Sequence, residues 1–284
     1  MNIVKLPDGT KVPALGLGTW RMGEGRTARP SEVAAMQLAI ELGYRLIDTA
    51  EMYGEGGAEE VVGQAVGESI RAGVVRREDL FIVSKAYPHN ASRAGVAQAC
   101  ERSLRRLGLD HLDLYLLHWR GQHPLRETVA GFEDLRGRGR IRRWGVSNCD
   151  ADDMAELWRV PHGSECAANQ VYYSLSERGI EFDLVPWLRE HGVPAMAYCP
   201  IDQGTLARAK ALRPLAERLG ATPAQVALAW LAQRGDVIAI PKAVQEAHLR
   251  ENLAAGDLAL DAAARAELDT LFPPPQRKKP LAMT

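Results

Sequence analysis

Three short apolar segments of the chain end in residues that can take part in proton transfer. Asp48 ends RLID, Lys85 ends LFIVSK and His118 ends LDLYLLH, and Tyr53 follows Asp48 by five positions. A buried Lys needs a counter-ion, and Asp48 is available as one. Because a neighbouring ammonium favours the phenolate, we expect Lys85 to lower the pKa of Tyr53 and to make it the proton donor. His118 would then hydrogen-bond the substrate oxygen.

Eight apolar segments predict the strands that position these residues. They lie at 15–20, 44–48, 80–85, 112–118, 142–148, 167–171, 194–199 and 237–242. Segments with helical spacing separate most of them. In the first of these helical segments, Ser31 is expected to cap a helix that ends at Gly43. Val33, Met36 and Ile40 form its buried face. Parallel strands that alternate with helices indicate an α/β protein with a (β/α)8 barrel.

The length of 284 residues fits one such barrel, which commonly has roughly 250 residues. We therefore expect a single domain over residues 1–284, with an N-terminal β-hairpin at 6–13 (LPDGTKVP) covering the barrel floor. A doubly wound sheet is the alternative fold. It predicts a third glycine after Gly16 and Gly18, where this chain has Arg21, so we prefer the barrel.

Charge and cysteine usage restrict the classes of partner. With 35 basic and 36 acidic residues, the chain has no excess charge to attract nucleic acid or an anionic membrane. It has neither a signal-like N-terminus nor the roughly 20 consecutive apolar residues that cross a bilayer. The four cysteines form no CxxC pair and the histidines no HExxH motif, so we expect no disulfide and no metal. We expect a cytoplasmic protein, a monomer, with a small-molecule partner.

The order and spacing of the motifs resemble those of the aldo-keto reductase family over almost the whole chain. The motifs are GLGTW, DTAxxYG, a Lys ending the third strand, LHW, GVSN, NQV, Y-x-P and IPK with an Asn ten residues later. The resemblance implies a (β/α)8 barrel that binds NADPH and transfers hydride to the carbonyl carbon of an aldehyde or ketone. It places the catalytic tetrad on Asp48, Tyr53, Lys85 and His118. In this family Tyr protonates the carbonyl oxygen and His orients the substrate.

The resemblance also implies where the cofactor and substrate bind. The carboxamide contacts correspond to Ser147, Asn148 and Gln170, and Tyr198 corresponds to the ring that stacks on the nicotinamide. Lys242 corresponds to the residue that contacts the 2′-phosphate. The expected substrate contacts are Trp20, Tyr53, His118 and Trp119. The expected cofactor contacts are Thr19, Trp20, Asp48, Ser147, Asn148, Gln170, Tyr198, Pro200, Ile201, Gln203, Lys242, Ala243, His248, Glu251 and Asn252.

Three positions depart from the pattern of the family. Asp202 replaces a common Gly in the pyrophosphate loop CPIDQG, and we expect its charge to disturb the geometry near the phosphates. Ala243 replaces a common Ser and His248 a common Arg, which removes a donor and a permanent bidentate charge. NADPH is therefore expected to be preferred through Lys242, with NADH tolerated. The basic, Pro-rich tail at 272–284 is expected to be solvated and to leave the pocket open.

Two other functions stay open at this point. A Lys at a barrel strand end can form a Schiff base, so a barrel aldolase using Lys85 is one alternative. Some relatives of the family act mainly as regulatory subunits, which makes a non-catalytic, cofactor-sensing barrel the other. The Asp near the Lys and the complete tetrad favour the reductase.

Overall fold

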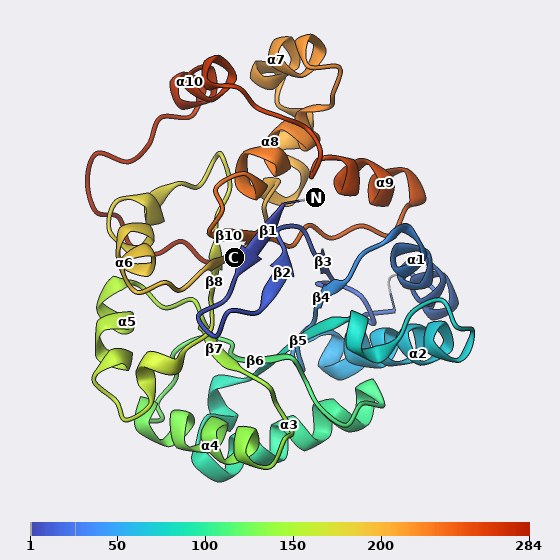
Figure 1. Cartoon of the computed structure of the whole chain (residues 1–284), viewed down its shortest axis with the longest axis vertical. Helices are drawn as coiled ribbons and strands as arrows, with labels where there is room; N and C mark the ends of the chain where they lie inside the picture. The colour runs from blue at the N-terminus through green and yellow to red at the C-terminus, as the bar shows by residue number, and fades with distance from the viewer. Residues whose placement is uncertain (1, 26) are drawn as a thin grey trace.

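The centre of the fold is a barrel of eight parallel strands (Figure 1), seen in a computed structural model that describes residues 2–25 and 27–284. Each strand pairs with its successor in the chain, and the isolated bridges Leu15–Ala239 and Gly18–Lys242 join the first strand to the last. The fold is therefore the predicted (β/α)8 barrel, and each predicted segment overlaps one strand, with β5 and β8 each ending one residue later than predicted. The strands are β3 (Leu17–Gly18), β4 (Leu46–Asp48), β5 (Phe81–Ala86), β6 (Leu114–Leu117), β7 (Trp144–Ser147), β8 (Asn169–Tyr172), β9 (Ala195–Tyr198) and β10 (Val237–Ala239).

Helices surround the barrel and cover the outer face of the strands (Figure 1). Most connections between strands contain one helix, and two helices lie between β9 and β10. Among the described residues, none of the helices is long and apolar enough to cross a membrane. The helices are α1 (Arg29–Leu42), α2 (Gly57–Arg71), α3 (Arg93–Leu107), α4 (Leu125–Gly137), α5 (Ala151–Trp158), α6 (Leu184–Glu190), α7 (Arg213–Arg218), α8 (Pro223–Ala232), α9 (Glu246–Ala254) and α10 (Ala262–Leu271).

Helix α1 begins earlier than the sequence predicts. It starts at Arg29, with Pro30 in its first turn, and its N-cap residue makes no side-chain hydrogen bond. The prediction that Ser31 caps this helix is therefore wrong, because Ser31 lies inside the first turn. Proline fits there since the first N–H groups of a helix have no partner within it. Gly43 ends the helix with a left-handed φ of 108°, as predicted.

The predicted N-terminal hairpin is present. Strands β1 (Ile3–Lys5) and β2 (Lys11–Pro13) pair antiparallel, with Val4 opposite Val12. Both valines are 1% exposed and belong to the hydrophobic core. Figure 1 shows the hairpin, in dark blue, lying across the middle of the barrel. It therefore buries apolar side chains against the barrel instead of projecting from it.

The C-terminal tail is exposed over most of its length, as predicted, but single residues hold it against the barrel. Lys278 Nζ contacts Asp152 at 2.9 Å and Asp183 at 3.3 Å, at the start of α5 and next to α6. Leu281 packs against the hydrophobic core. One of the basic residues that suggested solvation, Lys278, thus contacts carboxylates at the outer helices, and the last residues of the chain return towards the centre of the fold (Figure 1).

Candidate active site

Lys85 and Asp48 form a buried ion pair at the carboxyl end of the barrel. Lys85 lies on β5 and Asp48 ends β4, the neighbouring strand. Lys85 Nζ donates to Asp48 Oδ2 at 2.7 Å and to the carbonyl oxygen of Thr49 at 2.9 Å. The second carboxylate oxygen of Asp48 accepts from Gln170 Nε2 at 2.7 Å. Burial raises the pKa of Asp48 and lowers that of Lys85, and the charge of each partner works against the shift of the other.

Tyr53 lies against the same ammonium group. Its hydroxyl oxygen is 3.2 Å from Lys85 Nζ. The predicted direction of the pKa shift is wrong, because burial raises the pKa of Tyr53 well above 10.0 and Asp48 adds to the rise. The prediction weighed only the attraction of the ammonium, whereas desolvation of the phenolate is the larger effect in this site. Tyr53 therefore holds its proton at neutral pH, and Lys85 contacts the oxygen that carries it.

His118 faces Tyr53 from the end of β6. The two rings lie 5.7 Å apart, edge to face at 75°. His118 is 6% exposed, and its Nδ1 has no hydrogen-bond partner among the described residues. Burial lowers the pKa of His118 well below 6.5, and the charge of Lys85 lowers it further. The ring is therefore neutral at pH 7, with one nitrogen able to donate a hydrogen bond.

The low pKa of His118 predicts that stability depends on pH. Below pH 6.5 the unfolded chain binds a proton at this residue and the folded protein does not, so the free energy of unfolding falls as the pH falls. The slope from one such residue approaches about 1.4 kcal/mol per pH unit. Urea unfolding between about pH 8 and about pH 5 should show a shallower slope for His118→Gln than for the wild type. Equal slopes would mean that His118 is charged in the folded protein.

Polar side chains at the ends of β7, β8 and β9 lie together beside the predicted catalytic tetrad of Asp48, Tyr53, Lys85 and His118. Ser147 ends β7, Gln170 lies on β8 and Tyr198 ends β9. Asn148 Nδ2 donates to the carbonyl oxygen of His118 at 3.1 Å, and Tyr198 Oη donates to Asn148 Oδ1 at 2.9 Å. The structure thus brings together the four residues predicted to hold the nicotinamide end of a cofactor.

The residues predicted to bind the adenosine phosphate gather around the end of β10 and helix α9. Lys242 and His248 are exposed, Glu251 is half-buried and Asn252 is 4% exposed. Ala243, in contrast, is buried at 5% exposure and does not line the cavity described below. Its predicted contact with the cofactor therefore has no support in the structure. Its side chain ends at Cβ and is used for packing.

A cavity of about 860 Å³ extends from the residues predicted to hold the nicotinamide to those predicted to hold the adenosine phosphate. Every other predicted cofactor and substrate residue lines this cavity. Lys85 does not line it, but it is hydrogen-bonded to Asp48, which does. Met52, Trp20 and Trp119 give the cavity apolar surface near the tetrad. The predicted residues that line it are Thr19, Trp20, Asp48, Tyr53, His118, Trp119, Ser147, Asn148, Gln170, Tyr198, Pro200, Ile201, Gln203, Lys242, His248, Glu251 and Asn252.

Sequence reasoning missed several residues that line this cavity. Arg21 does so, and its guanidinium lies 4.3 Å from the centroid of the Trp20 ring. Its position directly after GLGTW is the signal that could have identified it. Arg208 lines the cavity from beyond the CPIDQG motif, where the sequence offers no signal. Met283 and Thr284 also line it, so the end of the tail lies at the cavity.

The carboxylate of Asp202 does not face the cavity. Ile201 and Gln203 on either side of it line the cavity, and among the described lining residues Asp202 is not present. Its oxygens accept hydrogen bonds from Tyr172 and Ser176 instead. The structure therefore gives the Asp202 carboxylate two hydroxyl partners, and its effect on the phosphates stays a prediction.

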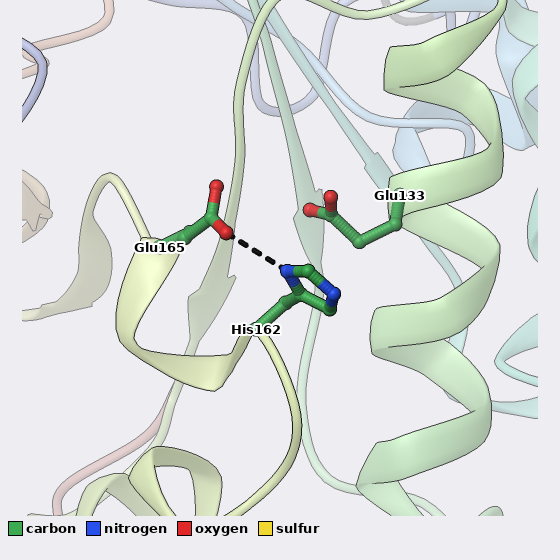
Figure 2. Close-up of side chains that lie close together, drawn as sticks. All are labelled: Glu133, His162 and Glu165. Carbon is green, nitrogen blue, oxygen red and sulfur yellow. Dashed lines mark hydrogen bonds and ion pairs between the residues drawn. The ribbon is translucent and has the colours of Figure 1, made fainter.

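One cluster of metal-ligating side chains lies away from this cavity, on α4 and the loop after α5. Glu133, His162 and Glu165 bring one potential ligand atom each to within 4.8 Å of one another, and His162 Nδ1 lies 2.9 Å from Glu165 (Figure 2). The Arg136 guanidinium contacts Glu133 at 2.6 Å and Glu165 at 2.5 Å. Trp144 Nε1 also donates to Glu133 at 2.6 Å. These contacts account for the cluster as an ion-pair network.

A barrel with this tetrad and this cavity defines a class of oxidoreductases that act on carbonyl groups. The Aldo/keto reductase family model matches residues 14–272, and the chain belongs to this family. Among curated relatives, "Methylglyoxal reductase YeaE" of Escherichia coli (strain K12) is 48% identical over 287 residues, covering 99% of each chain. "Glyoxal reductase" of Bacillus subtilis (strain 168) is 35% identical over 270 residues, covering 95% of this chain and 92% of the relative.

The similarity extends to solved structures. An aldo-keto reductase from Klebsiella pneumoniae, crystallised in complex with NADPH, has a TM-score of 0.94 and 49% identity. The match covers 100% of this chain and 99% of the other. At this level of similarity the barrel and the connections between its strands correspond throughout.

Proposed function

We propose that this chain reduces small 1,2-dicarbonyl compounds such as methylglyoxal, with NADPH as the hydride donor and Tyr53 as the proton donor. The family membership and the similarity to methylglyoxal and glyoxal reductases support the reaction and the substrate class. The observation that carries the proposal is the position of the Tyr53 hydroxyl, 3.2 Å from Lys85 Nζ and facing His118 at the cavity wall.

Each member of the tetrad has one task in the proton transfer. When bound, NADPH supplies hydride to the carbonyl carbon. His118 donates a hydrogen bond to the carbonyl oxygen and orients it. Tyr53 Oη gives its proton to that oxygen, which completes the alcohol. The phenolate left on Tyr53 lies 3.2 Å from Lys85 Nζ, whose charge stabilises it, and Asp48 holds Lys85 in place.

The residues that line the cavity fit NADPH. Ser147, Asn148 and Gln170 offer the hydroxyl and amide groups that can bind a carboxamide. At the other end, Lys242 supplies an ammonium and His248 an imidazole, both suited to phosphate oxygens. The distribution of donors thus follows the chemistry of a molecule with a carboxamide at one end and a phosphate at the other.

The surroundings of Lys85 argue against the aldolase alternative. Its Nζ is fully buried, contacts Asp48, Thr49 and Tyr53, and lies behind the cavity wall. A Schiff base requires an amine that reaches the substrate carbonyl. The regulatory alternative is disfavoured by the tetrad, because all four side chains are present and in contact with at least one other member.

Initial rates of NADPH oxidation with methylglyoxal, glyoxal, simple aldehydes, ketones and sugars test the proposed function. We expect the highest kcat/KM with the dicarbonyls, because a second carbonyl withdraws electron density from the first and promotes hydride attack. The apolar surface of Trp20 and Trp119 should tolerate small alkyl groups. A narrow preference for one bulky ligand would contradict the proposal.

His248 is expected to limit the discrimination between NADPH and NADH. His248→Arg supplies a permanent bidentate donor for the 2′-phosphate and should raise the NADPH to NADH ratio of kcat/KM by up to about tenfold. Lys242→Ala removes the ammonium group from the predicted phosphate site and should lower the same ratio. Rates with each cofactor at a fixed carbonyl concentration provide the measurement. A wild type that prefers NADH would overturn this assignment of the phosphate site.

We place the enzyme in the cytoplasm as a monomer. Its four cysteines are free thiols, and Cys100, Cys149 and Cys166 are buried, as is usual in a reducing compartment. Light scattering of the purified protein tests the monomer, since a dimer would double the apparent mass.

A further inference from the structure

Asp202 links the cofactor loop to the adjacent strand. This loop, Cys199–Gly204, follows β9, and its members Ile201 and Gln203 line the cavity. Asp202 Oδ1 accepts from Tyr172 Oη at 2.5 Å, and Oδ2 accepts from Ser176 Oγ at 3.1 Å. Tyr172 ends β8 and Ser176 follows it. One carboxylate thus connects two segments that are about thirty positions apart in the sequence.

Tyr172 in turn supports the ring predicted to stack on the nicotinamide. Tyr172 and Tyr198 are partners in the parallel register of β8 and β9. Their rings are stacked, with centroids 5.6 Å apart and an interplanar angle of 17°. Tyr198 is held at its far end by Asn148 Oδ1 at 2.9 Å. The position of the Tyr198 ring therefore depends on Tyr172 on one side and on Asn148 at its hydroxyl.

The turn of the loop fixes where the Asp202 side chain begins. Asp202 N–H donates to the carbonyl oxygen of Cys199 at 2.8 Å, and Thr205 N–H donates to that of Asp202 at 2.8 Å. Asp202 has a φ of 49°, a region that Asp tolerates better than most residues and that Gly adopts freely. A glycine could keep this turn, but it would lose both side-chain hydrogen bonds and increase the freedom of the loop.

We propose that Asp202 is a positioning residue that pre-forms the NADPH site. Its carboxylate anchors the loop Cys199–Gly204 and holds Tyr172 against Tyr198, so that the loop and the stacking ring are in place before the cofactor arrives. This inference rests on the proposed function, in which that loop and Tyr198 contact NADPH. It reverses the expectation for a carboxylate in a phosphate-binding loop, which is that its charge repels the cofactor.

The two roles of Asp202 predict opposite changes in affinity. If the residue anchors the loop, Asp202→Gly weakens NADPH binding by about tenfold, the loss expected for a hydrogen bond to a charged group. If it repels the phosphates, both Asp202→Gly and Asp202→Asn tighten binding, and the gain shrinks at high salt. Asn keeps an acceptor for the Tyr172 hydroxyl, so an anchor predicts that Asp202→Asn retains part of the wild-type affinity.

Tyr172→Phe provides a matched variant outside the loop. It keeps the ring stacked on Tyr198 and removes only the hydroxyl that donates to Asp202. We expect it to weaken NADPH binding by less than Asp202→Gly, because the Ser176 contact remains. Tyr172→Phe and Asp202→Asn act on the same hydrogen bond. The loss of NADPH affinity in the double variant should therefore be smaller than the sum of the two single losses and close to the larger of them.

Titration of each full-length variant with NADPH, followed by cofactor fluorescence, gives the dissociation constant, and stopped-flow displacement gives the release rate. The anchor predicts faster release and a higher KM for NADPH, with the KM for the carbonyl substrate unchanged. Wild-type or tighter NADPH binding by Asp202→Gly overturns the inference. Failure of the wild type to bind NADPH overturns the proposed function as well. The two failures are therefore distinguished by whether the wild type itself binds NADPH. If Asp202→Gly does not fold, Asp202→Asn and Tyr172→Phe decide, because wild-type binding and release in both variants overturns the anchor.

Discussion

Tyr53→Phe is expected to lower kcat by about 10²- to 10⁴-fold, the usual contribution of a positioned general acid. The substitution removes only the hydroxyl that lies 3.2 Å from Lys85 Nζ and leaves the ring packed beside His118. Proton transfer to the carbonyl oxygen then has no donor at the correct distance. NADPH binding should remain close to that of the wild type, because the predicted carboxamide contacts come from the end of β7 and from β8. Steady-state rates with methylglyoxal and a fluorescence titration with NADPH measure the two quantities separately.

Tyr87→Phe is a suitable control for the loss of a hydroxyl near the site. The Tyr87 hydroxyl donates to Glu55 at 3.0 Å, and the residue is not among the described residues that line the cavity. We expect this variant to keep most of the wild-type turnover. If Tyr53→Phe also turns over at the wild-type rate, Tyr53 is not the proton donor, and the reaction must draw its proton from another group.

The polar ends of the strands were the part of the site that could be predicted from the sequence. In a (β/α)8 barrel the carboxyl ends of all strands meet at one face, so any polar residue at the end of an apolar segment is brought to the same region. Asp48, Lys85 and His118 meet for this reason, although 70 positions separate the first from the last. The periodicity of the segments and the length of the chain were sufficient for this step.

Other features of the site depend on energies that no residue pattern displays. The pKa of Tyr53 is the balance of an ammonium contact against burial, and burial has the larger effect here. The orientation of Asp202 depends on Tyr172, which comes from another strand. The tail contacts distant segments through the Lys278 ion pairs and through Leu281, which packs on the core. Each outcome is set by contacts between distant segments, so motif and spacing leave it undetermined.

Lys85→Met is expected to lower the free energy of unfolding by about 3–5 kcal/mol, because it leaves the charge of Asp48 buried without its partner. Asp48 would keep the hydrogen bond from Gln170, but an amide does not supply the charge of the lost ammonium. The double variant Asp48→Asn/Lys85→Met removes both charges and should recover much of the loss. Urea unfolding of the two single variants and the double variant gives the coupling energy between the residues.

The pH dependence of this loss distinguishes a buried charge from a packing defect. Burial already raises the pKa of Asp48 above its usual 3.8, and removal of Lys85 raises it further. In Lys85→Met the folded protein then binds a proton at Asp48 that the unfolded chain releases above pH 3.8, so the variant loses stability as the pH rises. The deficit relative to the wild type should be small near about pH 4 and reach its full size at neutral pH. A deficit of equal size across this range would show that the methionine fails to fill the space of Lys85, and that the ion pair itself contributes little.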